Sequence, residues 1–85
     1  MKMSIKATEH NLYKTADLGL ATTLSLSFPI IAIDRNNPRK VLFVFNQPEE
    51  LISFVDRYWR GEVVVEPQLF TNQLKNIKTR IYSGE

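Results

Sequence analysis

The residues of this chain that could carry out chemistry are few and scattered. His10 is the only histidine, there is no cysteine, and the three glycines are too far apart to form a phosphate-binding loop. A zinc site would need several carboxylates beside one imidazole, which is an unusual ligand set. Glu49 and Glu50 open a predicted helix, where carboxylates complement the helix dipole without any catalysis. We therefore expect a protein that is not an enzyme and has no catalytic residue, metal, cofactor or small-molecule substrate.

A second group of residues has the composition of a protein-binding site. Tyr58, Trp59 and Arg60 are consecutive, and these residue types are the ones most enriched in the hot spots of protein interfaces. Neighbouring positions on a helix point about 100° apart, so one narrow buried stripe cannot cover both aromatic rings. We expect one ring to cap the core and the other to stay partly exposed for a partner, unless a wide core face buries both.

A third group of residues is basic. The net charge is +2, but the positive excess falls on residues 31–45 and 67–85, whereas residues 46–66 are acidic. If the predicted turn and the last helix share a side of the molecule, they would form a patch able to contact nucleic-acid phosphates, with little regard for base sequence. The alternative is that these charges only keep a turn and a helix soluble. The residues concerned are Arg35, Arg39, Lys40, Lys75, Lys78 and Arg80.

The elements that must position these residues begin with a predicted hairpin. Ile30–Arg35 and Lys40–Asn46 are rich in β-branched and aromatic residues, which predicts two strands. The second strand is apolar on both faces, so we expect it to be central or covered on both sides. The connector includes Asn36-Asn37-Pro38, which favours a turn with positive φ, and it is longer than a two-residue hairpin loop.

Three helices and a third strand complete the predicted elements. Thr15 suits the N-cap of a first helix that ends before Pro29. Asn46 to Glu49 has the spacing of a capping box for a second helix that runs to about Arg60 and stops at Gly61. Val63–Val65 predicts a third strand, and Glu66-Pro67 opens the last helix.

These elements predict an α+β protein with a single small domain in the order α-β-β-α-β-α. Its small sheet is built on a β-hairpin, with the helices packed mainly on one face. Residues 13–82 form the domain, residues 1–12 a flexible N-terminal arm, and residues 83–85 a frayed tail. The uncharged stretch Leu18–Ile33 is shorter than the ~20 residues that span a bilayer. We therefore expect a cytoplasmic protein without membrane contact.

Five short motifs follow one another along the chain: Tyr13–Leu18, Phe28-Pro29, Val41–Phe45, Tyr58–Glu62 and Leu74–Lys78. They resemble those of a family of short bacterial and phage domains of unknown function. The resemblance covers nearly everything after residue 12, in the family's order and spacing. Ser27 departs from the pattern, because the family often has glycine there. The resemblance implies no catalytic residue, and it implies a setting in phage or another mobile element.

The function that these observations favour is that of a small non-enzymatic interaction module. It would bind a protein partner, or a second copy of itself as a homodimer, through Tyr58, Trp59 and Arg60. The alternative is a nucleic-acid-binding accessory protein that uses the basic turn and the C-terminal helix.

Overall fold

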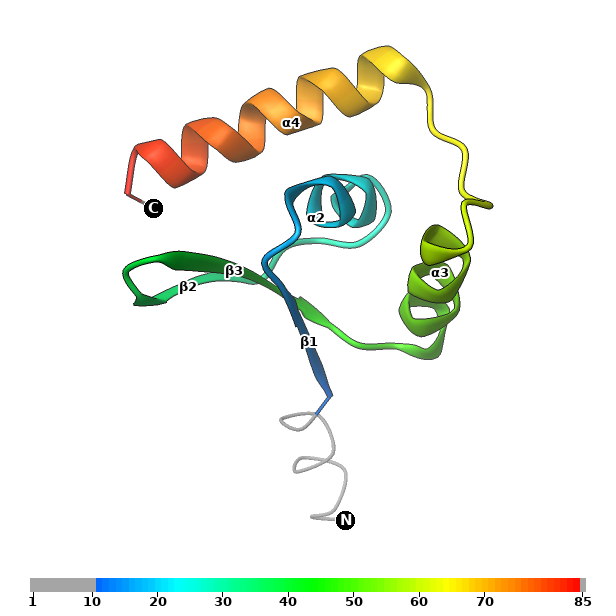
Figure 1. Cartoon of the computed structure of the whole chain (residues 1–85), viewed down its shortest axis with the longest axis horizontal. Helices are drawn as coiled ribbons and strands as arrows, with labels where there is room; N and C mark the ends of the chain where they lie inside the picture. The colour runs from blue at the N-terminus through cyan, green and yellow to red at the C-terminus, as the bar shows by residue number, and fades with distance from the viewer. Residues whose placement is uncertain (1–10, 85) are drawn as a thin grey trace.

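The computed structural model describes residues 11–84, which form three helices on one side of a three-stranded antiparallel sheet (Figure 1). The α+β class predicted from the sequence is confirmed. The predicted N-terminal arm lies outside the described residues up to His10, and Leu12 already belongs to a strand. In chain order the elements are β1 (Leu12–Thr15), α2 (Leu18–Ser25), β2 (Ala32–Asn37), β3 (Lys40–Asn46), α3 (Glu49–Trp59) and α4 (Pro67–Tyr82).

The sheet has the strand order β1-β3-β2, so β3 is central, as predicted. Both neighbours run antiparallel to it: Tyr13 pairs with Phe45, and Ile33 pairs with Phe43. Successive strand residues point to opposite faces. Phe43 and Phe45 therefore share the face that joins the core cluster, and Val44 faces the other side.

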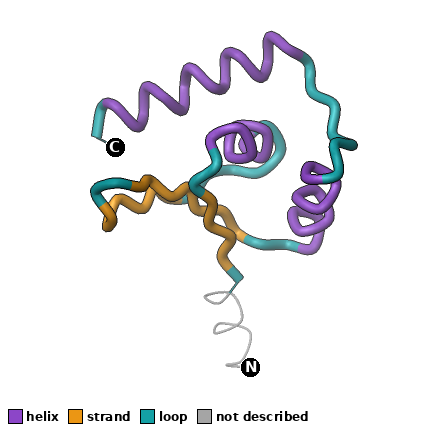
Figure 2. The backbone as a smooth tube through the Cα atoms, in the orientation of Figure 1, coloured by secondary structure: helices purple, strands orange, loops and turns teal. Residues whose placement is uncertain are grey.

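The third strand is not where the sequence placed it. Val63–Val65 is irregular, and β1 takes the third place in the sheet, so the order is β-α-β-β-α-α and not α-β-β-α-β-α. Figure 2 shows the reason, because the loop between α3 and α4 runs along the edge of the molecule that lies farthest from the strands. Strand propensity expresses itself only where a neighbouring strand is within reach.

The hairpin loop is shorter than predicted. Only Pro38 and Arg39 lie between β2 and β3, and the pairing register shifts between Asp34 and Asn37. Among the described residues only glycines have positive φ, so the two asparagines do not use it. Instead, the Asn37 side chain accepts a hydrogen bond from the Arg39 N–H at 2.9 Å, which stabilises the tip locally.

The helix starts show two further differences from the prediction. Asp17, not Thr15, caps α2, since its Oδ1 accepts a hydrogen bond from the Leu20 N–H at 2.9 Å. Thr15 instead ends β1 and accepts a hydrogen bond from the Asp17 N–H at 3.0 Å. The predicted capping box is also wrong: Asn46 is the last residue of β3, and Pro48 precedes α3 without a side-chain cap.

The other helix ends agree with the prediction. Gly61, with φ of 73°, follows the end of α3, a conformation that glycine adopts without strain. Glu66 caps α4, because its Oε1 accepts a hydrogen bond from the Leu69 N–H at 2.8 Å. Pro67 lies in the first turn of α4, where its missing N–H costs no intrahelical bond.

Helix α2 is the centre of the core. It lies between the sheet and α4 (Figure 1), and it contacts β1, α3 and α4. All five residues from Leu20 to Leu24 are buried, including Thr22 and Thr23. The two threonine hydroxyls donate hydrogen bonds to the carbonyls of Leu18 and Gly19, each at 2.8 Å, so burial leaves neither unpaired. The core cluster comprises Leu20, Ala21, Leu24, Phe43, Phe45, Leu51 and Ile77.

A candidate partner-binding surface

Helix α3 buries one stripe and leaves the rest of its surface exposed. Leu51 is fully buried, and Phe54, Val55 and Tyr58 pack against the core at helical spacing. Phe54 meets the ring of Phe28 edge-on, with the ring centroids 6.0 Å apart. This stripe fixes how α3 is rotated, and it places Trp59 on the flank of the buried face.

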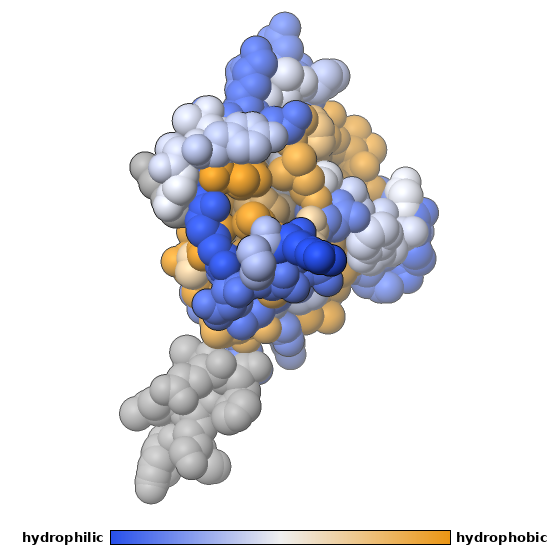
Figure 3. Space-filling model, turned by 60° about the vertical axis from the view of Figure 1, so that its left-hand side comes forward, coloured by the Kyte–Doolittle hydropathy of each residue, from blue (hydrophilic) through white to orange (hydrophobic). Residues whose placement is uncertain are grey.

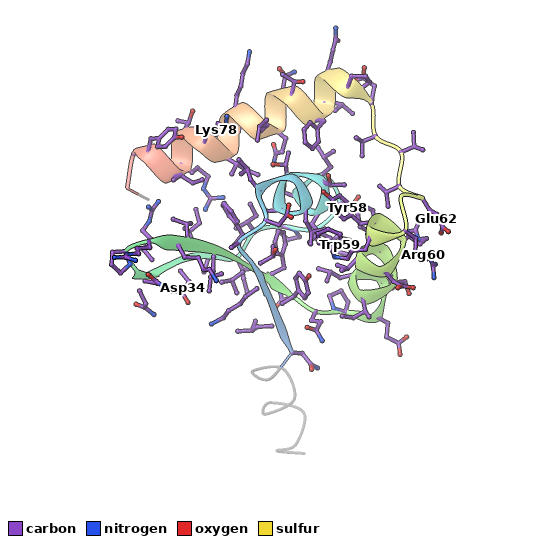
Figure 4. All side chains as sticks on the ribbon, in the orientation of Figure 1. Asp34, Tyr58, Trp59, Arg60, Glu62 and Lys78 are labelled. Carbon is purple, nitrogen blue, oxygen red and sulfur yellow. The ribbon has the colours of Figure 1, made fainter. Side chains whose placement is uncertain are left out.

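Trp59 is a large exposed aromatic residue held in place by its neighbour. Its exposed fraction is 61%, whereas Tyr58 is half-buried. The two rings meet edge to face at 88°, with their centroids 5.0 Å apart. In Figure 4 both lie on the side of α3 toward α2. The expectation that one ring caps the core and the other stays exposed is confirmed.

Tyr58 reaches helix α2 through a gap left by Gly19. A Cβ atom on Gly19 would lie 3.0 Å from the Tyr58 hydroxyl and 3.4 Å from Asp17 Oδ1. Burial, and then the negative charge of Asp17, raise the pKa of Tyr58, and the same two causes raise the pKa of Tyr13. The shift extends the pH range over which the Tyr58 phenol, already uncharged at neutral pH, stays uncharged.

Arg60 does not join the two aromatic rings. Its Nη1 lies 2.9 Å from Asp56 Oδ2 and its Nε lies 3.4 Å from Glu62 Oε2. Figure 4 shows Arg60 and Glu62 on the side of α3 away from Tyr58 and Trp59. Of the three residues predicted to bind a partner, the structure thus brings Tyr58 and Trp59 together and places Arg60 in a separate ion-pair network.

The exposed surface of α3 includes a further apolar residue that is not among the predicted site residues. Ile52 is exposed and lies seven positions before Trp59, which puts both on the same side of the helix. Asp56 lies between them at spacings of four and three. The seven-residue spacing of Ile52 and Trp59 could have indicated a shared face. The buried residues of the helix have a similar spacing, however, so the pattern does not show which face is exposed.

One basic residue of the hairpin contacts one basic residue of α4. Arg35 donates a hydrogen bond from Nη2 to the backbone carbonyl of Arg80 at 3.0 Å, and both side chains are half-buried. Arg39 and Lys40 are exposed at the hairpin tip, which lies beside the last turns of α4 (Figure 1). Figure 3 brings this end forward and shows strongly hydrophilic residues beside an apolar area.

The remaining members of the basic set lie along α4. Lys75 and Lys78 are exposed, and Figure 4 labels Lys78 on the half of α4 that ends above the hairpin. Asp34 is the acidic residue of the hairpin, and its Oδ2 lies 3.5 Å from Lys14 Nζ. A hydrogen bond from the Asn36 N–H, and then the nearby Lys14 ammonium, lower the pKa of Asp34.

Comparison with known proteins gives a family but no function. A family model described as a domain of unknown function (DUF5659) matches residues 10–83, which include every helix and strand described above. The chain matches no curated protein and no solved structure. Within residues 11–84, no helix is long and apolar enough to cross a membrane.

Proposed function

The chain belongs to the DUF5659 family of domains of unknown function, and we propose that it is a non-enzymatic module that binds a protein partner through α3. The observation that carries the proposal is the exposure of Trp59, at 61%, on a ring that Tyr58 already orients edge-on. Burying an aromatic ring of this size contributes strongly to interface affinity. A ring that is already oriented loses little conformational entropy on binding.

The surroundings of Trp59 have the layout of a protein interface. Ile52 extends the apolar surface along the same side of α3, and the Asp56–Arg60 ion pair borders it. An apolar centre with a polar, solvated rim is the usual anatomy of such sites. We define the α3 surface as Ile52 and Trp59, with the exposed Asp56 at its border.

The direct test asks what contacts position 59. An aromatic photo-crosslinking amino acid in place of Trp59, which keeps a ring at this position, should capture a protein in the source cells or a second copy of the chain. The same group in place of Tyr82 is the control, because Tyr82 is also an exposed aromatic residue, at 80%, and lies at the C-terminal end of α4. A homodimer would also appear in sedimentation, and Trp59→Ala should weaken it at least tenfold while Tyr82→Ala leaves it intact. A strict monomer with no specific crosslink at position 59 would contradict the proposal.

A second candidate function is nucleic-acid binding at the end where the hairpin meets α4. The observation that favours it is the hydrogen bond from Arg35 to Arg80, since it brings two basic segments together. Charge reversal of Arg39 and Lys40 tests it, because both side chains are exposed. A gel shift at about 50 mM salt should be lost in this double variant and retained in Arg57→Glu on α3. If the wild-type chain gives no shift at this salt concentration, the candidate is rejected.

Two finer expectations stay predictions. A cytoplasmic location rests on the interpretation of Leu18–Ile33 as a core helix and strand and not as a secretion signal or membrane span. A phage or mobile-element setting rests on the resemblance of the sequence motifs alone.

A further inference from the structure

The connector between α3 and α4, residues 62–66, is anchored at both ends and unpaired in the middle. The Glu62 N–H donates to the Arg57 carbonyl at 2.9 Å, and the Glu66 carbonyl accepts from the Phe70 N–H at 3.1 Å. Within residues 11–84, no backbone-to-backbone hydrogen bond involves Val63, Val64 or Val65. Val64 is 93% exposed, the highest value among the exposed large apolar residues of the described chain.

This segment has the composition of a β-strand without a neighbouring strand. Three consecutive β-branched residues favour an extended, paired backbone. The fold holds the segment at the outer edge of the molecule, far from the sheet (Figure 1). We propose that the connector is a docking strand, to which an extended segment of a partner protein adds by backbone hydrogen bonding, as in other cases of strand addition.

Charge decides which segment fits. Antiparallel pairing with the same connector of a second copy, centred on Val64, would set Glu62 opposite Glu66 on both sides. Like charges directly opposite each other destabilise a strand pair. A segment with lysine or arginine at both ends would instead place opposite charges there. Glu62 Oε2 already lies 3.4 Å from Arg60 Nε and Glu66 Oε1 accepts from the Leu69 N–H, so the partner's basic ends would share these exposed carboxylates with Arg60 and the α4 N-cap. The structure therefore favours a basic partner strand, and this inference shares with the proposed function only the premise that the partner is a protein.

Two synthetic peptides test the inference on the full chain. The basic probe is acetyl-Lys-Val-Thr-Val-Lys-amide, and the matched acidic probe carries glutamate in place of both lysines. At millimolar concentration and low salt, the basic probe should shift the amide resonances of residues 63–65 and slow their hydrogen exchange. The acidic probe should bind roughly tenfold more weakly, because two opposite-charge pairs become like-charge pairs. If the basic probe leaves these three amides unchanged, the inference is wrong.

A pair of proline variants separates strand pairing from simple charge attraction. Alternate N–H groups of a strand point to opposite edges, so Val63→Pro and Val64→Pro remove donors from different edges. Strand addition uses one edge, so one variant should lose at least tenfold in affinity and the other should bind normally. Val64→Thr keeps the N–H and the β-branched side chain, and it should bind like the wild type. Equal binding by both proline variants would overturn the inference.

The outcome is separable from that of the proposed function. Trp59→Ala should leave the binding of the basic probe unchanged, because the connector residues and not the indole ring form the docking strand. Failure of the probe together with a specific crosslink at position 59 rejects the docking strand alone. Probe binding without any crosslink at position 59 rejects the α3 surface alone.

Discussion

Arg35 and Arg80 are 45 positions apart in the chain, and the guanidinium of the first donates a hydrogen bond to the backbone carbonyl of the second at 3.0 Å. The bond joins β2 to the last turn of α4. A cation beside the carbonyls at a helix C-terminus is also favoured by the helix dipole. One side chain therefore holds the C-terminal end of α4 against the hairpin.

Loss of this contact should destabilise the fold. Arg35→Ala should lower the free energy of unfolding by about 1–2 kcal/mol, because a charged hydrogen bond in a half-buried place is lost. Chemical denaturation measures this change, and hydrogen exchange should show the last turn of α4 opening first. Arg39→Ala is the control, since Arg39 is exposed and its removal should cost under about 0.5 kcal/mol. Equal effects of the two variants would show that the bond to Arg80 contributes nothing.

Gly19 and Tyr58 should show a coupled effect. Glycine to alanine in a helix ordinarily adds about 0.5–1 kcal/mol of stability. Here the new Cβ would lie 3.0 Å from the Tyr58 hydroxyl, so Gly19→Ala in the wild type should be neutral or destabilising. In a Tyr58→Phe background the hydroxyl is gone, and the ordinary gain should return. A double-mutant cycle from thermal or chemical unfolding measures the coupling, and strict additivity would refute the close contact.

The N-cap of α2 should matter to stability. Asp17→Ala removes the acceptor for the Leu20 N–H and should cost about 1 kcal/mol, whereas Asp17→Asn keeps an acceptor and should cost less. The measurement is urea unfolding followed by far-ultraviolet circular dichroism. A cost equal in the two variants would mean that the carboxylate charge, and not the hydrogen bond, is the contribution of Asp17.

Asp34 should give the fold a pH dependence on the acid side. Its folded pKa lies below the ordinary value of 3.8, so the ionised form stabilises the folded state. This contribution is complete above the ordinary value and is lost as pH falls through the folded pKa. The stability difference between the wild type and Asp34→Asn should therefore shrink on acidification. In a Lys14→Met background most of this pH dependence should remain, because the hydrogen bond from the Asn36 N–H lowers the pKa of Asp34 more than Lys14 does. A difference that stays constant with pH would contradict this.

The three described helices and the hairpin could be predicted because their signals are local. The proline near the start of α4 and the glycine after α3 act within a few residues. The strand β1 could not be predicted in this way, since Leu12–Thr15 is short and mixed in character. Thr15 of β1 pairs with Phe43, which lies 28 residues later in the chain. The one sign of such a strand was the central position predicted for β3, because a central strand needs a neighbouring strand on each side.

The sequence predicts which residue types form the candidate surface, but it does not predict which of them are exposed or contact one another. The sequence indicates that Tyr58 and Trp59 cannot share one narrow stripe, but the rotation of α3 against the core decides which ring is exposed, and Gly19 leaves room for the Tyr58 hydroxyl. Arg60 was grouped with them by adjacency, whereas its actual partners are Asp56, one helical turn back, and Glu62 beyond the helix end.

Helix α2 occupies the middle of the fold but the first third of the chain. A ribosome releases residues 18–25 long before α3 and α4, which cover two of their sides. During synthesis this uncharged segment therefore stays exposed until α3 and α4 have been made and can cover it. Chains that end before α4 should therefore aggregate or be degraded. A chaperone that binds nascent chains would be expected to bind the α2 segment as it emerges.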